Sequence, residues 1–347
     1  MKKISRKGLF NGLFLISIFV LTVWAVFKGE DLSQVGQALS MANPMYILPG
    51  IVCVVLFIIG ESAVILYLLR SLGTKIPFGH CCLYSFIGFF YSCITPSASG
   101  GQPMQIIAMR KDKIPVAVST VVLAIVTITY KMVLVAIGLA VMLLRPSGVM
   151  TYLDGIEGLV YLGLGLNVIA ISLLLMLVFC PSILRKCATA ILGWISRIRP
   201  FRNPEKIYAK LDEVMSQYTG TADYYRSHKR VILNVFVLTL VQRCILFLVT
   251  YLAYKAFGLS GHSLATIVTL QAMISVVVDM LPLPGGMGIS ENLFLQIFLP
   301  IFGSALVLPG MLISRGVSYY TQLLISAAMT VAATFLLRNT NEKEHKE

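Results

Sequence analysis

Long apolar runs dominate the chain, and short polar stretches divide them. Six runs are long enough to cross a hydrocarbon core as helices, which takes roughly 20 residues each. These predicted spans are Leu9–Phe27, Tyr46–Leu69, Ile114–Leu144, Leu159–Phe179, Val231–Tyr254 and Ala305–Leu337. The pattern therefore predicts an all-α polytopic membrane protein. The first run is too long for a cleavable signal peptide and has few small residues beside it, so we expect it to be retained.

Composition and charge support a membrane protein. Hydrophobic residues make up 57% of the 347 positions, and charged residues only 12%, against about 25% in soluble domains. The net charge of +13 does not indicate nucleic acid, because Lys and Arg cluster at alternate ends of the spans. By the positive-inside rule, this distribution predicts both termini in the cytoplasm, and we expect the protein in the plasma membrane. The seven cysteines lack the spacing of a disulfide framework or metal site, and we expect no cofactor.

Two polar interruptions fall inside apolar segments that do not read as ordinary spans. The first, TPSASGGQP at 95–103, lies between Arg70 and Arg110, which the charge rule places on the same side. The second is DMLPLPGGMGISEN at 279–292. We predict two opposed re-entrant helical hairpins, over residues 78–109 and 262–303. Irregular backbone at membrane depth is tolerated only inside protein or beside a wet cavity, so both tips should face something polar.

The two halves of the chain have matching spacings. Gly285 follows Gly100 by 185 residues, and Arg315 follows Lys131 by 184. The order in each half is span, span, hairpin, span, and the halves start on opposite sides of the membrane. This order predicts an inverted-topology repeat, which many transporters use to expose a midplane site to each side in turn. The predicted halves are residues 1–145 and 158–338.

A polar segment at 181–230 separates the halves, and a polar tail follows at 339–347. Asn203 and Pro204 predict a helix start, and apolar residues then recur at helical spacing. They are Ile207, Leu211, Val214, Met215 and Tyr218. Two interpretations stay open at this point. The helix either lies on the anionic inner leaflet as an amphipathic helix, or it packs on the cytoplasmic ends of the spans within a basic, topology-setting loop.

Ionisable side chains within the apolar segments are candidate functional residues, because each costs roughly 2.5–3.5 kcal/mol on insertion scales. They are Glu61, Lys131, Arg243, Asp279, Glu291 and Arg315. Three are acidic and three basic, so a purely structural network of buried ion pairs is the alternative, and this alternative is stronger for Glu61 and Arg243.

The hairpin tips supply the remaining candidates. We expect Gly100 and Gly101 to permit the first turn, and Ser290 to cap the half-helix that leaves the second. Each outgoing half-helix offers free N–H groups to a phosphate or carboxylate, and Lys131 and Arg315 would complete the positive charge. The predicted substrate-binding residues are Ser97, Ser99, Gly100, Gly101, Gln102, Lys131, Asp279, Gly285, Gly286, Ser290, Glu291 and Arg315. No catalytic residue or metal ligand is predicted.

The stretches SASGGQP at 97–103 and PLPGGMGISE at 282–291 resemble the paired signatures of the lysylphosphatidylglycerol synthase transmembrane-region family of flippase-like membrane proteins. The resemblance covers nearly the whole chain. It implies a lipid translocase that moves lysylphosphatidylglycerol to the outer leaflet and confers resistance to cationic antimicrobial peptides. Full-length members add an aminoacyltransferase domain. Only residues 339–347 follow the last predicted span, so we expect that activity to be absent.

We therefore predict translocation between leaflets of a phospholipid or other phosphate-bearing lipid, such as lysylphosphatidylglycerol or a lipid-linked precursor. The expected partner is an anionic or zwitterionic lipid, with a separate lipid-modifying enzyme or a second copy of the chain as further partners. One alternative is the membrane part of a phosphatidylglycerol lysyltransferase system, or an intramembrane lipid-modifying enzyme with Asp279 or Glu291 as general base. Others are an ion-coupled transporter of a small anion and a non-transporting scaffold.

Overall fold

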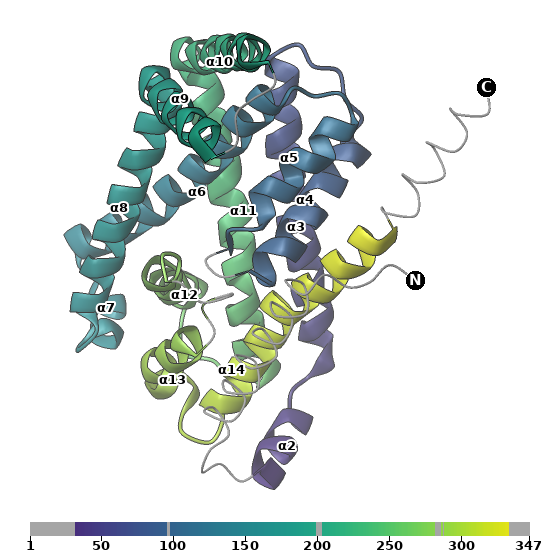
Figure 1. Ribbon diagram of the computed structural model, residues 1–347. Helices are drawn as coiled ribbons and strands as arrows, with labels where there is room; N and C mark the ends of the chain where they lie inside the picture. The colour runs from purple at the N-terminus through teal and green to yellow at the C-terminus, as the bar shows by residue number, and fades with distance from the viewer. Residues whose placement is uncertain (1–31, 96–97, 199–202, 282–285, 287, 333–347) are drawn as a thin grey trace.

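The computed structural model describes residues 32–95, 98–198, 203–281, 286 and 288–332. These residues form helices joined by short turns and include no β-strand. Long helices run side by side in a bundle, and the pair α9 (Pro181–Ile198) and α10 (Pro204–Ser227) lies across one end of it (Figure 1). The predicted span Leu9–Phe27 lies outside the described residues.

Four helices are long and apolar enough to cross a membrane, and they coincide with four predicted spans. They are α3 (Ile47–Ser71, preceded by the 3-10 turn η1, Pro44–Tyr46), α6 (Val116–Leu144), α8 (Glu157–Phe179) and α11 (Lys229–Ala256). Local signals fix the ends of α3. The Asn43 side chain accepts the N–H of Met45 at 2.9 Å, and Pro44 takes a first helical position, which needs no N–H partner. After α3, Gly73 adopts φ +79, which glycine tolerates best.

Each polar interruption separates two short helices. α4 (Phe78–Cys93) and α5 (Gly101–Lys111) flank the first, while α12 (Leu264–Val278) and α13 (Ile289–Phe302) flank the second. At about 1.5 Å per residue, none of them reaches the roughly 30 Å of a hydrocarbon core. α4 packs on α5 and α12 packs on α13, so each interruption is the turn of a helical hairpin. That these hairpins enter a bilayer without crossing it stays a prediction.

The predicted span Ala305–Leu337 is not one regular helix. It begins as α14 (Val307–Arg315), continues as the π-helical segment η4 (Gly316–Thr321), and returns to α-helix over 322–332. Such π-helical turns often occur at functional sites. The Tyr319 hydroxyl donates to the carbonyl oxygen of Cys93 at 2.9 Å, so η4 is attached to the end of α4.

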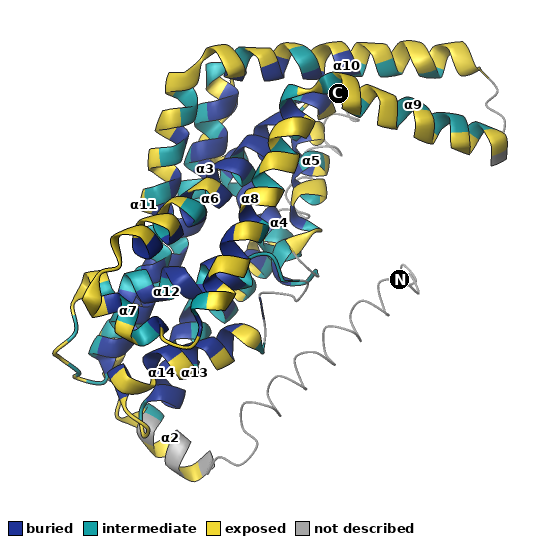
Figure 2. Ribbon diagram, turned by 90° about the vertical axis from the view of Figure 1, so that its left-hand side faces the viewer, coloured by how far each residue is buried: buried dark blue, intermediate teal, exposed yellow. Residues whose placement is uncertain are grey.

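The helices follow the same order in both halves: one long helix, two short helices and a further helix. α3 packs along α11, and α6 packs on α8 and α11. The first hairpin lies toward the end of the bundle that carries α10, and the second lies toward the opposite end, near α2 (Leu32–Ser40) and α7 (Ser147–Leu153) (Figure 1). Buried residues form the inner faces of these helices, whereas α9 and α10 expose most of theirs (Figure 2).

The apolar stripe predicted in 181–230 belongs to α10 and packs on the bundle. Met215 and Tyr218 are buried, and the Tyr218 hydroxyl donates to the carbonyl oxygen of Leu177 in α8 at 3.2 Å. The Tyr225 hydroxyl donates to the carbonyl oxygen of Leu68 in α3 at 2.9 Å. For α10, these contacts favour the interpretation in which the helix packs on the ends of the spans.

Close packing of α8 against α12 depends on Gly163. A Cβ at this position would lie 2.7 Å from the backbone oxygen of Val276, which cannot move aside easily. We expect Gly163→Ala to lower the free energy of unfolding by roughly 1–3 kcal/mol, as overpacking does. Gly165→Ala, two residues away in open space, is the matched control and should cost nothing. Thermal unfolding of the detergent-solubilised protein measures both, and equal stability of the two variants would contradict the packing.

Candidate functional site

Among the described residues of the first hairpin tip, Ala98 rather than a glycine has a positive φ. Ala98 adopts φ +53, whereas Gly100 has φ −81 and Gly101 is the first residue of α5. Neither glycine therefore uses a backbone conformation that other residues avoid. The glycines instead allow close contact: a Cβ on Gly101 would lie 2.1 Å from Ser92 Oγ and 2.7 Å from the Gly88 carbonyl oxygen.

The second hairpin tip, residues 279–288, does use its glycines. Gly286 has φ +66 and Gly288 has φ +86. Gly288 is also the N-cap of α13, so the expectation that Ser290 caps this helix is wrong. The Glu291 side chain does so: its Oε2 accepts the N–H of Gly288 at 2.6 Å and the Ser290 hydroxyl at 2.8 Å. The N-terminus of α13 thus already holds a carboxylate.

The two predicted cations that follow the hairpins each have a carboxylate partner. Arg315 Nε lies 2.9 Å from Glu291 Oε1, and Lys131 Nζ lies 2.5 Å from Asp279 Oδ2. The Tyr130 hydroxyl donates to the other oxygen of Asp279. The pair between Lys131 and Asp279 joins α6 of the first half to the end of α12 in the second half, and both side chains are about nine-tenths buried.

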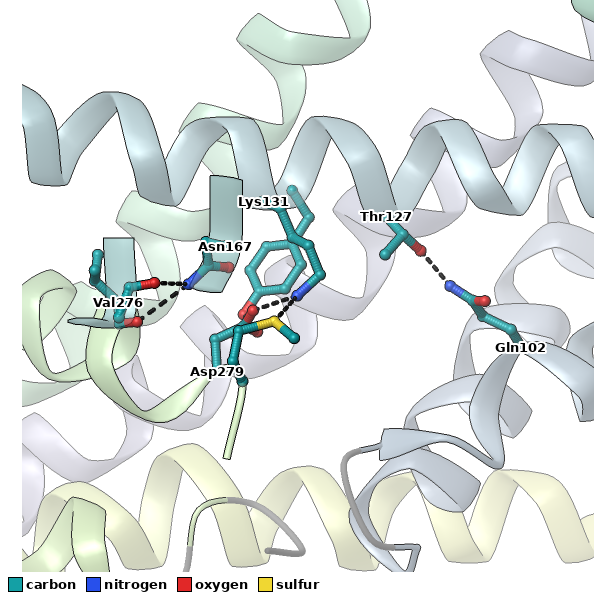
Figure 3. Close-up of polar contacts among 9 residues, drawn as sticks. Gln102, Thr127, Lys131, Asn167, Val276 and Asp279 are labelled. Carbon is teal, nitrogen blue, oxygen red and sulfur yellow. Dashed lines mark hydrogen bonds and ion pairs between the residues drawn. The ribbon is translucent and has the colours of Figure 1, made fainter. Parts of the chain in front are cut away.

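Helix α6 contacts both hairpins from one face. Thr127 and Lys131 project from it one turn apart (Figure 3). The Gln102 amide of the first hairpin donates to Thr127 Oγ1, while Lys131 bonds to Asp279 of the second. α6 therefore fixes the position of each hairpin relative to the other.

Two neighbouring cavities lie between the hairpins. The larger, of 470 Å³, is lined by Ser99 and Gln102 of the first hairpin and by residues of α3, α6, α11 and η4. The smaller, of 210 Å³, is lined by Gly286, Ser290 and Arg315. Both cavities share Ala98, Tyr130 and Asp279, so the buried ion pair and its tyrosine stand where the cavities meet.

Two cations line the larger cavity, Lys131 and Arg243 of α11. Lys131 pairs with Asp279, whereas no described carboxylate lies within salt-bridge distance of Arg243. Its guanidinium carbon lies 3.5 Å from the centre of the Tyr130 ring and 4.9 Å from that of Phe57. Its Nε atom is buried and has no hydrogen-bond partner in the described part of the chain. Aromatic faces hold a guanidinium in place without using its N–H donors, so the donors that face the cavity remain available to a ligand.

Glu61 of α3 lines the same cavity. Its Oε1 accepts the Gln105 amide of α5 at 2.9 Å, which attaches the first hairpin to α3. Glu61 and Arg243 were recognised as costly charges in spans but were not included among the predicted binding residues. Their 182-residue spacing, close to that of Gly100 and Gly285, was the sequence signal that could have placed them together.

A comparison with protein-family models decides the family. The model of the lysylphosphatidylglycerol synthase TM region matches residues 12–326. The chain belongs to this family. No curated protein matches it significantly. A lipid-related membrane function follows from the family and from the four membrane-length helices.

Within this family member, the cavities gather most of the described predicted site residues. Ser99, Gln102, Lys131 and Asp279 line the larger cavity, and Asp279, Gly286, Ser290 and Arg315 line the smaller. Gly100 and Gly101 form the closely packed start of α5, and Glu291 pairs with Arg315 beside the smaller cavity. Ser97 and Gly285 lie outside the described residues. That any of these residues binds substrate stays a prediction.

The ion pair between the halves makes a testable contribution to stability. Removing one partner of a buried pair leaves an uncompensated charge, so Lys131→Met alone and Asp279→Leu alone should each cost roughly 3–5 kcal/mol. The double variant should recover most of that loss. Arg145→Gln, at the exposed pair with Glu157, is the control and should change little. Thermal unfolding tests this coupling, and additive losses in the double variant would show that the two charges do not depend on each other.

Proposed function

We propose that the protein translocates a phosphate-bearing lipid between the leaflets of the cell membrane, and that Arg243 binds the phosphate. The observation that carries the proposal is a guanidinium in a partly polar cavity between two helical hairpins, with no carboxylate within salt-bridge distance among the described residues. Lys131 and Arg315 are compensated by Asp279 and Glu291. A ligand anion would pair with Arg243 directly, whereas Glu61 of the same cavity attracts it from beyond salt-bridge distance.

The chemistry of the lining fits a lipid head group. Guanidinium binds phosphate through two parallel N–H donors, which a lysine cannot reproduce. Ser99 and Gln102 add a hydroxyl and an amide on the first hairpin. A volume of 470 Å³ falls in the range of small-ligand sites, about 300–1,000 Å³, so it suits a head group without its tails. The tails would then stay in the surrounding lipid.

The proposed topology has six spans, two opposed re-entrant hairpins and both termini in the cytoplasm. The shared helix order and the positions of the hairpins toward opposite ends of the bundle support an inverted repeat. Cysteine labelling tests it in a cysteine-free background. An impermeant maleimide added outside intact cells should label Ser260→Cys, which follows α11, and should reach Lys75→Cys, between α3 and α4, only after permeabilisation. Labelling of both from outside would rule the topology out.

Alternating access would use the boundary between the cavities. When the pair between Lys131 and Asp279 separates, the larger and smaller cavities join, and a head group on Arg243 gains a path toward Ser290 and Arg315. Binding of the phosphate near Tyr130, which contacts both Arg243 and Asp279, is the step that would loosen the pair.

Leaflet redistribution in proteoliposomes tests the function. We expect the wild type to move phosphatidylglycerol labelled on an acyl chain, with its chemical structure unchanged. Arg243→Gln should lower the rate roughly ten- to hundredfold, since it removes charge-assisted hydrogen bonds, and Arg243→Lys should recover only part of it. Arg145→Gln removes an exposed arginine and should leave the rate unchanged.

Each rival function has its own signature in the same preparation. Conversion of the lipid into a new species would indicate an intramembrane enzyme. Uptake of phosphate or another small anion without lipid movement would indicate an anion transporter. Equal lipid movement by the wild type and Arg243→Gln would contradict the proposed site.

A further inference from the structure

Helix α9 has an apolar stripe that no other described residue covers. Ile191 is 57% exposed and Trp194 is 65% exposed, and Ile183 and Cys187 are exposed too. These four residues lie three or four positions apart, so they share one face of the helix. A single exposed apolar side chain is ordinary, but a continuous stripe of this kind marks an interaction surface.

α10 lies on the other side of α9. Arg185 forms an ion pair with Asp212 of α10 at 2.8 Å. Trp194 follows Arg185 by nine positions, about 2.5 helical turns, and so points away from α10. The apolar stripe therefore cannot be covered by α10.

The position of α9 directs its apolar stripe toward the space beside the membrane-length helices. α9 starts after Cys180, at the end of the membrane-length helix α8. It extends outward from the bundle and lies on the same side of α10 as the spans (Figure 2). The face turned away from α10 is thus directed toward the volume that a bilayer around the spans would occupy.

The charges of α9 match an anionic surface. It carries Arg185, Lys186 and Arg197 and no acidic residue. Lys186 and Arg197 border the apolar stripe, and neither forms an ion pair with another residue in the described ranges. α10 lies on the far side of α9 from this volume and has more acidic than basic residues. The acidic residues are Glu205, Asp212, Glu213 and Asp223, and the basic ones are Lys206, Lys210 and Arg226.

We infer that α9 is an interfacial helix that binds the anionic lipid surface beside the bundle. Ile183, Ile191 and Trp194 enter the boundary between head groups and acyl chains, and Lys186 and Arg197 lie at the level of the lipid phosphates. Long basic side chains bury their methylenes in such a boundary while their charges stay in water. This inference uses the fold and the charges of α9 and does not depend on lipid translocation.

Trp194 reports directly on the inference, because the chain contains only one other tryptophan, Trp24. In full-length Trp24→Phe protein in phosphatidylglycerol nanodiscs, brominated lipid should quench Trp194 strongly and aqueous acrylamide weakly. In phosphatidylcholine the lipid quenching should weaken. The added variant Lys186→Gln/Arg197→Gln should remove most of this lipid preference, since each basic residue contributes about fivefold to binding of an anionic surface.

A tryptophan on α10 supplies the matched control. In Trp24→Phe/Trp194→Phe/Tyr208→Trp protein, the exposed position 208 should be quenched by acrylamide and not by brominated lipid. Trp194 behaving like this control would overturn the inference. A second outcome would overturn it as well. If Trp194 is not quenched by brominated lipid and is shielded from acrylamide only at high protein-to-lipid ratios, a second copy of the chain covers the stripe.

Discussion

A buried ion pair between Lys131 and Asp279 holds the two halves of the protein together where its cavities meet. Neither charge is stable alone in an apolar bundle, so the closed pair keeps α6 and the second hairpin in register. One turn earlier on α6, Thr127 accepts the Gln102 amide of the first hairpin. The positions of both hairpins, and therefore the shape of the space between them, depend on this one face of α6.

The pairing of the buried charges also indicates that Arg243 is the residue most suited to bind a ligand. Asp279 compensates Lys131, and Glu291 compensates Arg315 while also occupying the N-terminus of α13. Arg243 instead lies against two aromatic rings. A charged group kept in an apolar bundle at this cost is a functional candidate by default, and a guanidinium matches the geometry of a phosphate with two N–H donors. The family places this chemistry in a lipid-related membrane protein.

The sequence patterns predicted the helices better than they predicted the contacts between side chains. Four spans were predicted to within a few residues, because about 20 apolar residues must occur together to cross a membrane. The two hairpin turns followed from proline and glycine at 95–103 and 279–292. Composition could not show that Ala98 adopts a positive φ in the first tip, or that Gly101 allows close contact with Ser92.

The pairing of charges could not be predicted either, because partners such as Lys131 and Asp279 are 148 residues apart and meet only in the folded bundle. Arg243 was therefore recognised as costly but not as a binding residue. In the polar segment between the halves, the stripe on α10 was recognised, while the equally regular stripe on α9 was overlooked.

A binding titration tests whether Arg243 binds a lipid phosphate. Short-chain phosphatidylglycerol should raise the unfolding temperature of the purified protein, whereas the matching diacylglycerol, which lacks the phosphate, should not. In Arg243→Gln, the apparent affinity for the phosphate lipid should fall roughly tenfold or more. Equal stabilisation by both lipids, or an unchanged affinity in Arg243→Gln, would show that Arg243 does not bind the phosphate.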